Sequence, residues 1–156
     1  MKLLEVKSQR EFEAEIVEVD VKDFKKIKKS KQFDFDWEKE KENHVFKIVE
    51  KSESEDQEIL GLISLINISD EFRIYVNLIE NSNENKGRDK KIDRIAGCLL
   101  AFAAQVAFEN GYQGFVSLVP KTELIKLYVN KYGFSQYGRQ LAIEKRDAIN
   151  LIQKFL

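Results

Sequence analysis

The chain of 156 residues is long enough for one domain with a substantial core, and 34% of its residues are charged. Because the formal net charge is only −1, the chain lacks the overall field that attracts nucleic acid or acidic membranes, and we expect neither as a partner. The single cysteine, Cys98, excludes a disulfide framework and a cysteine-based metal cluster. The first residues also lack the apolar stretch of a signal peptide, so we expect a cytoplasmic protein with a single domain over residues 1–156.

The first thirty residues predict a strand followed by a short helix. Residues 1–10 are too mixed in character to decide between a short strand and a loose arm. Phe12–Val21 alternates apolar and acidic residues with a period of two, which indicates a strand with one solvated face. Lys22–Lys31 has apolar residues at helical spacing, and Asp23 is a candidate for the helix cap.

An aromatic and acidic segment, Phe33–Asn43, fits two structures. The alternation in its first half predicts an edge strand, whereas its charged second half favours a solvated helix end. Its aromatic side chains either cover one end of the core or line an acceptor pocket. In the second case Asp34 and Asp36 would attract a cationic amine.

The middle of the chain predicts a meander of three antiparallel strands. His44–Glu50 and Ile59–Ser69 are apolar runs joined by an acidic, turn-forming loop, which predicts a hairpin. Phe72–Ile79 follows after a two-residue turn and supplies the third strand. Gly61 lies inside the second strand, where a glycine marks a bulge or the close approach of another element.

A strand-helix-strand unit follows the meander. The polar, lysine-rich loop Glu80–Lys91 leads into the apolar helix Ile92–Asn110, which Gly111 ends, and Gly114–Val119 is the next strand. Such a unit requires a parallel crossover from the third meander strand. A basic loop that leads into a helix N-terminus between two strands is typical of sites for phosphorylated ligands.

The C-terminal part predicts two more helices and one more strand region. Thr122 is a candidate N-cap for the helix Thr122–Tyr132, and Phe134–Lys145 is a strand, or a bent pair of strands interrupted at Gly138. Asp147–Leu156 is a short amphipathic helix. The fold class is therefore α/β (α+β layered), with a mixed, mostly antiparallel sheet of six to seven strands flanked by helices.

The order of these elements resembles the GCN5-related N-acetyltransferase (GNAT) superfamily. The resemblance is carried by the meander at 44–79, by AGCLLAFAAQVAFENGYQGFVSLV at 96–119, and by LIKLYVNKYGF at 124–134. It implies a GNAT-like acyl-CoA N-acyltransferase fold with acetyl-CoA as the acyl donor and an amine as the acceptor. It further implies direct attack of the amine on the thioester in a ternary complex, without a metal.

The acyl-CoA signature of the family, Q/R-x-x-G-x-G/A, falls on residues 91–96. Lys91 stands for the first position and Ala96 satisfies the last, but Arg94 replaces the middle glycine. Phosphate oxygens bind the free amides of the first helical turn in such sites, and arginine has the right charge to meet them. The resemblance thus implies a group of cofactor-binding residues: Lys91, Asp93, Arg94, Ile95, Ala96 and Gly97.

The resemblance also implies roles for residues outside the signature. A backbone amide around Leu78 or Ile79 would polarise the thioester carbonyl, and Tyr128 would donate a proton to the departing thiolate. Glu80, at the end of the third meander strand, is the candidate general base. Lys121 occupies a place where the family often has an asparagine that contacts CoA.

One alternative stays open, because the signature glycine is missing and the resemblance does not fix the base. The chain could be a non-catalytic GNAT-fold domain that acts as an acyl-CoA sensor or a protein-interaction module. The sequence does not identify the amine acceptor. Exposed strand edges in such folds can pair, which would allow a homodimer.

Overall fold

The computed structural model describes residues 1–156, and the chain forms two compact units. The units consist of the following segments: Met1–Ser64 with Leu78–Leu99 in the first, and Leu65–Asn77 with Leu100–Leu156 in the second. The boundary passes through elements that contribute to both units, namely β4 (Gly61–Ile68), β5 (Arg73–Asn81) and α2 (Ile95–Glu109).

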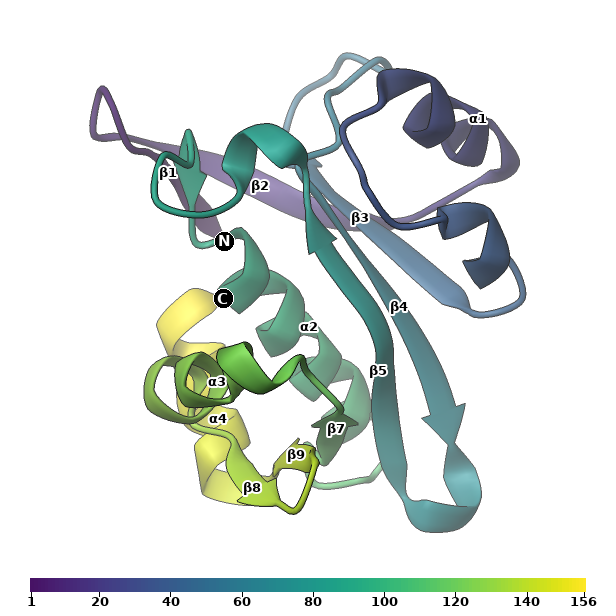
Figure 1. Ribbon diagram of the computed structural model, residues 1–156, viewed down its shortest axis with the longest axis vertical. Coiled ribbons are helices and arrows are strands. Elements are labelled where there is room, and N and C mark those ends of the chain that lie inside the picture. Colours follow the sequence, from purple (N-terminus) through teal and green to yellow (C-terminus); the bar gives the residue numbers. More distant parts are fainter. The chain divides into compact units, whose positions relative to one another are not determined.

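The structure confirms a mixed α/β fold (Figure 1), with nine strands hydrogen-bonded in the order β6-β1-β2-β3-β4-β5-β7-β9-β8. Besides β4 and β5, the strands are β1 (Lys2–Glu5), β2 (Arg10–Glu18), β3 (His44–Glu50), β6 (Ile92–Asp93), β7 (Val116–Leu118), β8 (Ser135–Tyr137) and β9 (Gln140–Ile143). Besides α2, the α-helices are α1 (Val21–Ser30), α3 (Ile125–Tyr132) and α4 (Lys145–Phe155). Short 3-10 helices lie at η1 (Trp37–Glu40), η2 (Ser69–Glu71), η3 (Asn83–Asn85) and η4 (Thr122–Leu124).

The first unit contains an N-terminal hairpin that the sequence did not predict. β1 pairs antiparallel with β2, and β2 pairs antiparallel with β3. The other side of β1 pairs antiparallel with the two-residue strand β6, so that Leu4 lies opposite Asp93 and Glu5 opposite Ile92. These additional strands explain why the sheet has more strands than expected.

A hydrophobic cluster of the first unit fixes α1 and the aromatic segment that follows it. Phe24 and Ile27 of α1 pack with Trp37, which is 2% exposed, and with residues of β3 and β4. Asp20 caps the helix, since it accepts a hydrogen bond from the Asp23 amide at 2.8 Å while the Asp23 carboxylate accepts one from the Asp20 amide at 3.0 Å. The predicted cap, Asp23, is therefore the third helical residue of a capping box.

The second unit contains the predicted parallel crossover. Ile74 to Val76 of β5 pair in parallel with Val116 to Leu118 of β7, while β7 pairs antiparallel with β9. β8 and β9 form an antiparallel hairpin that turns at Gly138, whose φ of 63° is a left-handed conformation that suits glycine. The predicted interruption at Gly138 is thus confirmed.

Aromatic rings join α3 to α4 in the second unit. The Tyr128 ring makes edge-to-face contacts with Tyr132 and Phe134, at 5.7 Å between centroids in each case. Tyr132 in turn lies 5.8 Å from Phe155 of α4. Gly133 ends α3 with a φ of 84°, as predicted from the Tyr132–Gly133 pair.

Candidate functional site

The turn between β6 and α2 occupies the position of the predicted acyl-CoA signature. A single residue, Arg94, separates the end of β6 at Asp93 from the start of α2 at Ile95, and its φ is 81°. This left-handed backbone conformation is uncommon for a residue with a Cβ atom, whereas glycine adopts it readily. The backbone at the place of the signature glycine therefore has the form that favours glycine, although the residue is arginine.

Two hydrogen bonds hold Arg94 in this conformation. Its amide donates to the Asp93 side chain at 2.8 Å, and its Nε donates to the carbonyl oxygen of Lys2 in β1 at 3.1 Å. The Asp93 carboxylate also lies 3.1 Å from the Lys90 ammonium group. Asp93 thus organises the turn, and β1 anchors the Arg94 side chain.

The first turn of α2 presents free backbone amides. The first hydrogen bond within the helix runs from the Cys98 amide to the Arg94 carbonyl oxygen at 3.0 Å. The amides of Ile95, Ala96 and Gly97 therefore have no partner within the helix. Together with the helix dipole, three such amides can hold the phosphate groups of a ligand.

The predicted helix start at Ile92 is wrong by three residues, because Ile92 and Asp93 form β6 instead. Ile95, the first residue of α2, is closely packed. A Cβ atom added at Gly61 of β4 would lie 2.6 Å from Cγ2 of Ile95, which is 1% exposed. Gly61 therefore marks the close approach of another element, one of the two interpretations of this residue from the sequence.

The basic loop carries fewer free positive charges than the sequence suggests. Lys86 contacts two carboxylates, Lys90 pairs with Asp93, and the Lys91 ammonium group lies 3.3 Å from Glu84. Lys91 is exposed, and an exposed ion pair contributes at most about 1 kcal/mol, so a phosphate group could replace Glu84 as its partner. Among the lysines of this loop whose ion pairs are described above, Lys91 is therefore the one best able to meet a phosphate.

The end of β5 holds the predicted carbonyl-polarising residues. Leu78 packs against the hydrophobic cluster of the first unit, and side chains alternate along a strand, so Ile79 faces the opposite side. Both residues are partly buried. They lie immediately before Glu80, whose carboxylate organises a polar network.

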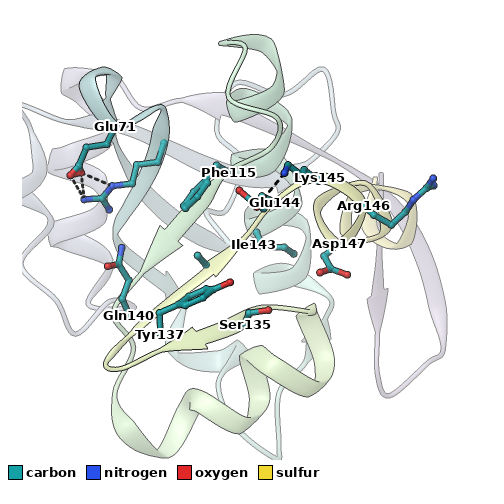
Figure 2. Close-up of a pocket in the computed structure, with 12 residues that line it drawn as sticks. Glu71, Phe115, Ser135, Tyr137, Gln140, Ile143, Glu144, Lys145, Arg146 and Asp147 are labelled. Atoms are coloured by element: carbon teal, nitrogen blue, oxygen red, sulfur yellow. Dashed lines mark hydrogen bonds and ion pairs between the residues drawn. The ribbon is translucent and has the colours of Figure 1, made fainter.

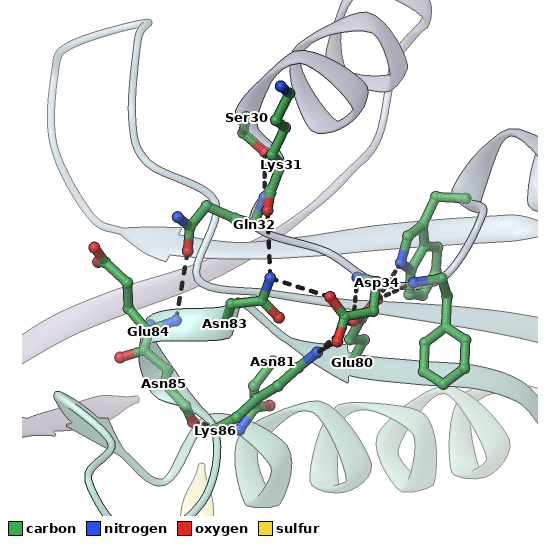
Figure 3. A network of polar contacts seen from close by, with 12 residues as sticks. Ser30, Lys31, Gln32, Asp34, Glu80, Asn81, Asn83, Glu84, Asn85 and Lys86 are labelled. Carbon is green, nitrogen blue, oxygen red and sulfur yellow. Dashed lines mark hydrogen bonds and ion pairs between the residues drawn. The ribbon is translucent and has the colours of Figure 1, made fainter.

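Glu80 is a buried residue with several donors around its carboxylate (Figure 3). Its side chain is 1% exposed and accepts hydrogen bonds from the amides of Asp34 at 2.7 Å and Phe35 at 3.2 Å. The Trp37 indole Nε1 donates at 2.8 Å and the Lys86 ammonium group at 2.6 Å. Glu80 therefore connects the end of β5 to the aromatic segment after α1.

The aromatic segment forms neither an edge strand nor a long helix. Residues 33–36 form an irregular loop with a bend at Phe35, and Trp37–Glu40 is the 3-10 helix η1. Both aspartates of the segment have protein partners, since Asp34 pairs with Lys86 at 3.0 Å and Asp36 caps η1 through the Glu38 amide. The side-chain hydrogen bond from Lys86 is the main reason why the pKa of Asp34 is lowered. Asp34 and Asp36 are therefore not free to attract a cationic amine, as one interpretation of the sequence required.

The other two predicted site residues, Tyr128 and Lys121, belong to the second unit. Tyr128 is 7% exposed, and burial raises the pKa of its phenol to about 12, so the hydroxyl stays protonated at neutral pH. Lys121 is exposed and precedes η4, where its carbonyl oxygen accepts a hydrogen bond from the Leu124 amide at 2.9 Å. The predicted cap residue Thr122 is the first residue of η4, and Lys121 is the N-cap.

The second unit also contains a cavity of about 700 Å³ (Figure 2). It is lined by the start of β5, the β8–β9 hairpin and the start of α4, and none of the predicted site residues lines it. Acidic and basic side chains balance in its lining, and Arg73 is already bound to Glu71 at 3.0 Å and to the Ser117 hydroxyl at 2.6 Å.

Comparisons with known proteins agree with this arrangement of elements. The sequence matches no protein-family model and no curated protein at a significant level. Among solved structures, variant forms of the spermidine/spermine N-acetyltransferase SpeG from Vibrio cholerae align with a TM-score of 0.61 and 14% identity, over 88% of this chain and 96% of that chain. The ribosomal-protein-S18-alanine N-acetyltransferase from Escherichia coli aligns with a TM-score of 0.57 and 12% identity, over 84% and 90% of the two chains. This chain has the GNAT fold.

A third N-acetyltransferase structure shares the GNAT fold. It is the NatC complex bound to Gag peptide and CoA, which aligns with a TM-score of 0.57 and 15% identity, over 85% of this chain and 99% of that chain. In the present chain, no group of His, Cys, Asp or Glu side chains could hold a metal ion. No helix is long and apolar enough to cross a membrane.

Sequence reasoning missed the buried amide that supports the loop of this GNAT fold. Asn85 is 2% exposed, its amide nitrogen donates to the Ser82 hydroxyl at 2.7 Å, and its side-chain oxygen accepts from the Ile92 amide at 2.9 Å. The run of Asn and Ser residues at 81–85 was a signal, since these residues favour turns stabilised by their own side chains. The partners of Asn85 could not be read from that signal.

Proposed function

We propose that the protein is an acyl-CoA-dependent N-acyltransferase, which transfers an acetyl group from acetyl-CoA to an amine by direct attack. The observation that carries this proposal is the left-handed turn at Arg94, followed by three free amides at the start of α2. A cradle of this form at the signature position suits a phosphorylated donor. The GNAT fold adds the expectation that this donor is acetyl-CoA.

In this proposal the first unit binds the donor. Acetyl-CoA supplies an activated acetyl group as its thioester. The amides of Ile95, Ala96 and Gly97 hold its phosphates, and the exposed Lys91 contributes a positive charge. A backbone amide at Leu78 or Ile79 donates a hydrogen bond to the carbonyl oxygen and so stabilises the negative charge that develops there.

The proposed proton donor is Tyr128 of the second unit. Its burial raises the pKa to about 12, so that it carries its proton at any physiological pH. A neutral phenol can donate that proton to the departing thiolate. Lys121 is proposed as a contact for the donor because of its place in the family pattern.

The predicted base, Glu80, is surrounded by hydrogen-bond donors of the protein. A general base must have a free acceptor position within hydrogen-bond reach of the proton that it removes. The four donors around Glu80 compete for that position. The proposal of direct transfer therefore does not depend on Glu80. A deprotonated amine attacks without an enzyme base, its nitrogen then loses one proton to water, and Tyr128, after protonating the thiolate, regains a proton from solvent.

The acceptor is proposed only as a primary amine. The solved N-acetyltransferases that share the fold act on spermidine or spermine, or on an alanine of a ribosomal protein, and one is bound to a peptide. Both a small polyamine and a peptide N-terminus are therefore reasonable first acceptors. We further propose a cytoplasmic location, which suits a chain whose single cysteine, Cys98, is buried and forms no disulfide.

A second candidate function, an acyl-CoA sensor without turnover, is favoured by the engagement of Glu80. Two measurements separate the candidates. Acetyl-CoA at 100 times its Kd should stabilise the protein by about 2.7 kcal/mol, measured by thermal or urea unfolding. Release of free thiol from acetyl-CoA in the presence of spermidine or an alanine-initiated peptide then identifies an enzyme.

The outcomes differ for each function. Stabilisation with amine-dependent thiol release supports the transferase, whereas stabilisation without release across a broad amine panel supports the sensor. No stabilisation by acetyl-CoA at millimolar concentration would remove both functions. Desulfo-CoA, which keeps the phosphates but has no thiol, is the matched control for binding through the amide cradle.

A further inference from the structure

The Glu80 carboxylate has no acceptor position left for a substrate proton. Oε2 accepts from the Asp34 amide at 2.7 Å and from the Lys86 ammonium group at 2.6 Å. Oε1 accepts from the Trp37 indole at 2.8 Å and from the Phe35 amide at 3.2 Å. An ionised carboxylate offers about four lone-pair sites, so these donors use all of them.

Most of these donors belong to one segment, residues 34–37. Two successive backbone amides and one indole group of this segment point at the same carboxylate, which fixes the path of the chain there. Trp37 is buried in the hydrophobic cluster, whereas Phe35 is 43% exposed. Glu80 therefore binds the backbone of this segment and the Trp37 indole, while the Phe35 ring is exposed to solvent.

Lys86 completes the arrangement by bridging Glu80 and Asp34. Its ammonium group lies 2.6 Å from Glu80 and 3.0 Å from Asp34. Burial alone would lower the pKa of Lys86, but the hydrogen bonds and charges of Glu80 and Asp34 outweigh burial and raise it. Lys86 thus stays charged and neutralises the buried carboxylate.

The same network extends toward α2 (Figure 3). Asn83 donates from its backbone amide to the Gln32 carbonyl oxygen at 2.7 Å, and from its side chain to Asp34 at 3.2 Å. Asn85 accepts a hydrogen bond from the Ile92 amide at 2.9 Å. Continuous polar contacts therefore run from the segment after α1, past the end of β5, to the loop that leads into α2.

We infer that Glu80 is a positioning residue that fixes segment 34–37 beside the end of β5, and that it does not accept the substrate proton. The kinetic part of this inference rests on the proposed transferase function. Glu80 directly follows Leu78 and Ile79, whose amides are the proposed contacts of the thioester carbonyl. Segment 34–37 is thus held next to the reacting carbonyl, where the exposed Phe35 ring forms one wall for the incoming amine.

The kinetic test compares Glu80→Gln with Trp37→Phe and with the control Glu42→Gln. Trp37→Phe removes one donor to Glu80 and keeps an aromatic ring, while Glu42 is an exposed carboxylate outside the network. Loss of a hydrogen bond to a buried charge should raise the KM for the amine about tenfold or more in both network variants. We expect kcat to change by less than about threefold, and the acidic limb of the pH profile of kcat/KM to stay in place.

A general base would give the opposite pattern. In that case Glu80→Gln would lower kcat by about 100-fold or more, abolish the acidic limb and leave the KM for the amine nearly unchanged, whereas Trp37→Phe would have little effect. That result would overturn the inference. Glu42→Gln should match the unsubstituted chain in either case.

A second measurement does not require activity, so it separates this inference from the proposed function. Amide hydrogen exchange at Asp34 and Phe35 should become at least about tenfold faster in Glu80→Gln, because their acceptor is weakened. If Glu80→Gln does not fold, faster exchange at the same amides in Trp37→Phe tests the same network. Unchanged exchange at both amides would overturn the positioning role, even if acetyl transfer had never been detected.

Discussion

The backbone and the side chain of Arg94 have opposite effects on the stability of the protein. Its left-handed φ of 81° costs a residue with a Cβ atom roughly 1–2 kcal/mol, but its guanidinium group gains a hydrogen bond to the Lys2 carbonyl oxygen. Substitution by alanine and by glycine separates these two effects, because both variants lose the guanidinium group and only glycine loses the strain.

We therefore expect Arg94→Gly to be more stable than Arg94→Ala by about 1 kcal/mol, the reverse of the usual order of these two residues in an extended or helical chain. Urea unfolding of both variants measures the difference. Equal stability, or a more stable alanine variant, would mean that the left-handed turn is not maintained in solution.

Tyr128 is the residue on which the chemistry of the proposal depends. Phenylalanine keeps the ring that packs against Tyr132 and Phe134 and removes only the hydroxyl. We expect Tyr128→Phe to lower kcat by roughly 100-fold or more, as for loss of a general acid, with little change in the affinity for acetyl-CoA. Steady-state rates and an acetyl-CoA titration check this, and an unchanged kcat would remove Tyr128 from the mechanism.

At the scale of elements, the first turn of α2 depends on the absence of a side chain in β4. A Cβ atom at Gly61 would lie 2.6 Å from Ile95 Cγ2 and 3.2 Å from Leu99 Cδ1. Gly61→Ala should therefore destabilise the protein by about 1–3 kcal/mol and weaken acetyl-CoA binding, because Ile95 must move together with the amide cradle.

The double variant Gly61→Ala with Ile95→Ala provides the control for this prediction. It removes the crowded methyl group, so acetyl-CoA affinity should recover relative to Gly61→Ala even though the core loses some packing. Calorimetric titration of both variants measures the affinity. Full affinity in Gly61→Ala alone would show that the position of Ile95 does not control the cradle.

Local patterns predicted most of these elements. His44–Glu50 was predicted to the residue, and the parallel crossover and the turn at Gly138 followed from apolar runs separated by glycines. The start of α2 was misplaced because Ile92 and Asp93 pair with residues 4 and 5, a long-range contact that no local pattern reveals. The N-terminal hairpin was missed for the same reason.

The candidate site was predictable in part. The resemblance to the family pattern placed the signature at residues 91–96, and the structure shows a left-handed backbone at Arg94. Cofactor binding at this turn stays a prediction. The environment of Glu80 was not predictable, since three of its donors come from residues more than 40 positions earlier in the chain. A carboxylate at the end of a strand looks the same in the sequence whether it faces a substrate or four donors.

At the scale of the whole molecule, two buried groups make stability sensitive to alkali. Burial raises the pKa of the Tyr128 phenol from 10.0 to about 12 and that of the Cys98 thiol from 9.0 to about 11. The unfolded chain releases each proton at the lower pH, so the stabilisation is complete below that value and is lost as the pH rises through the folded-state pKa. For Tyr128 the loss falls between about pH 10 and pH 12 and amounts to about 2–3 kcal/mol.

The free energy of unfolding should therefore decrease less steeply with pH in Tyr128→Phe than in the unsubstituted chain over this range. Urea unfolding at a series of pH values measures both slopes. Below pH 9 the two proteins should show a constant difference in stability, and parallel slopes above pH 10 would contradict the burial of an intact phenol.

The pairing of β1 with β6 has a consequence for the proposed binding of acetyl-CoA. Residues 2–6 close the loop before α2, through strand pairing at Leu4 and Glu5, a hydrogen bond from the Val6 amide to the Lys91 carbonyl oxygen at 2.9 Å, and the Lys2 contact to Arg94. Deletion of residues 2–6 would remove these contacts to the turn at Arg94, which we propose binds the donor. The affinity for acetyl-CoA would then depend on residues that lie about 90 positions away in the sequence from the proposed binding turn.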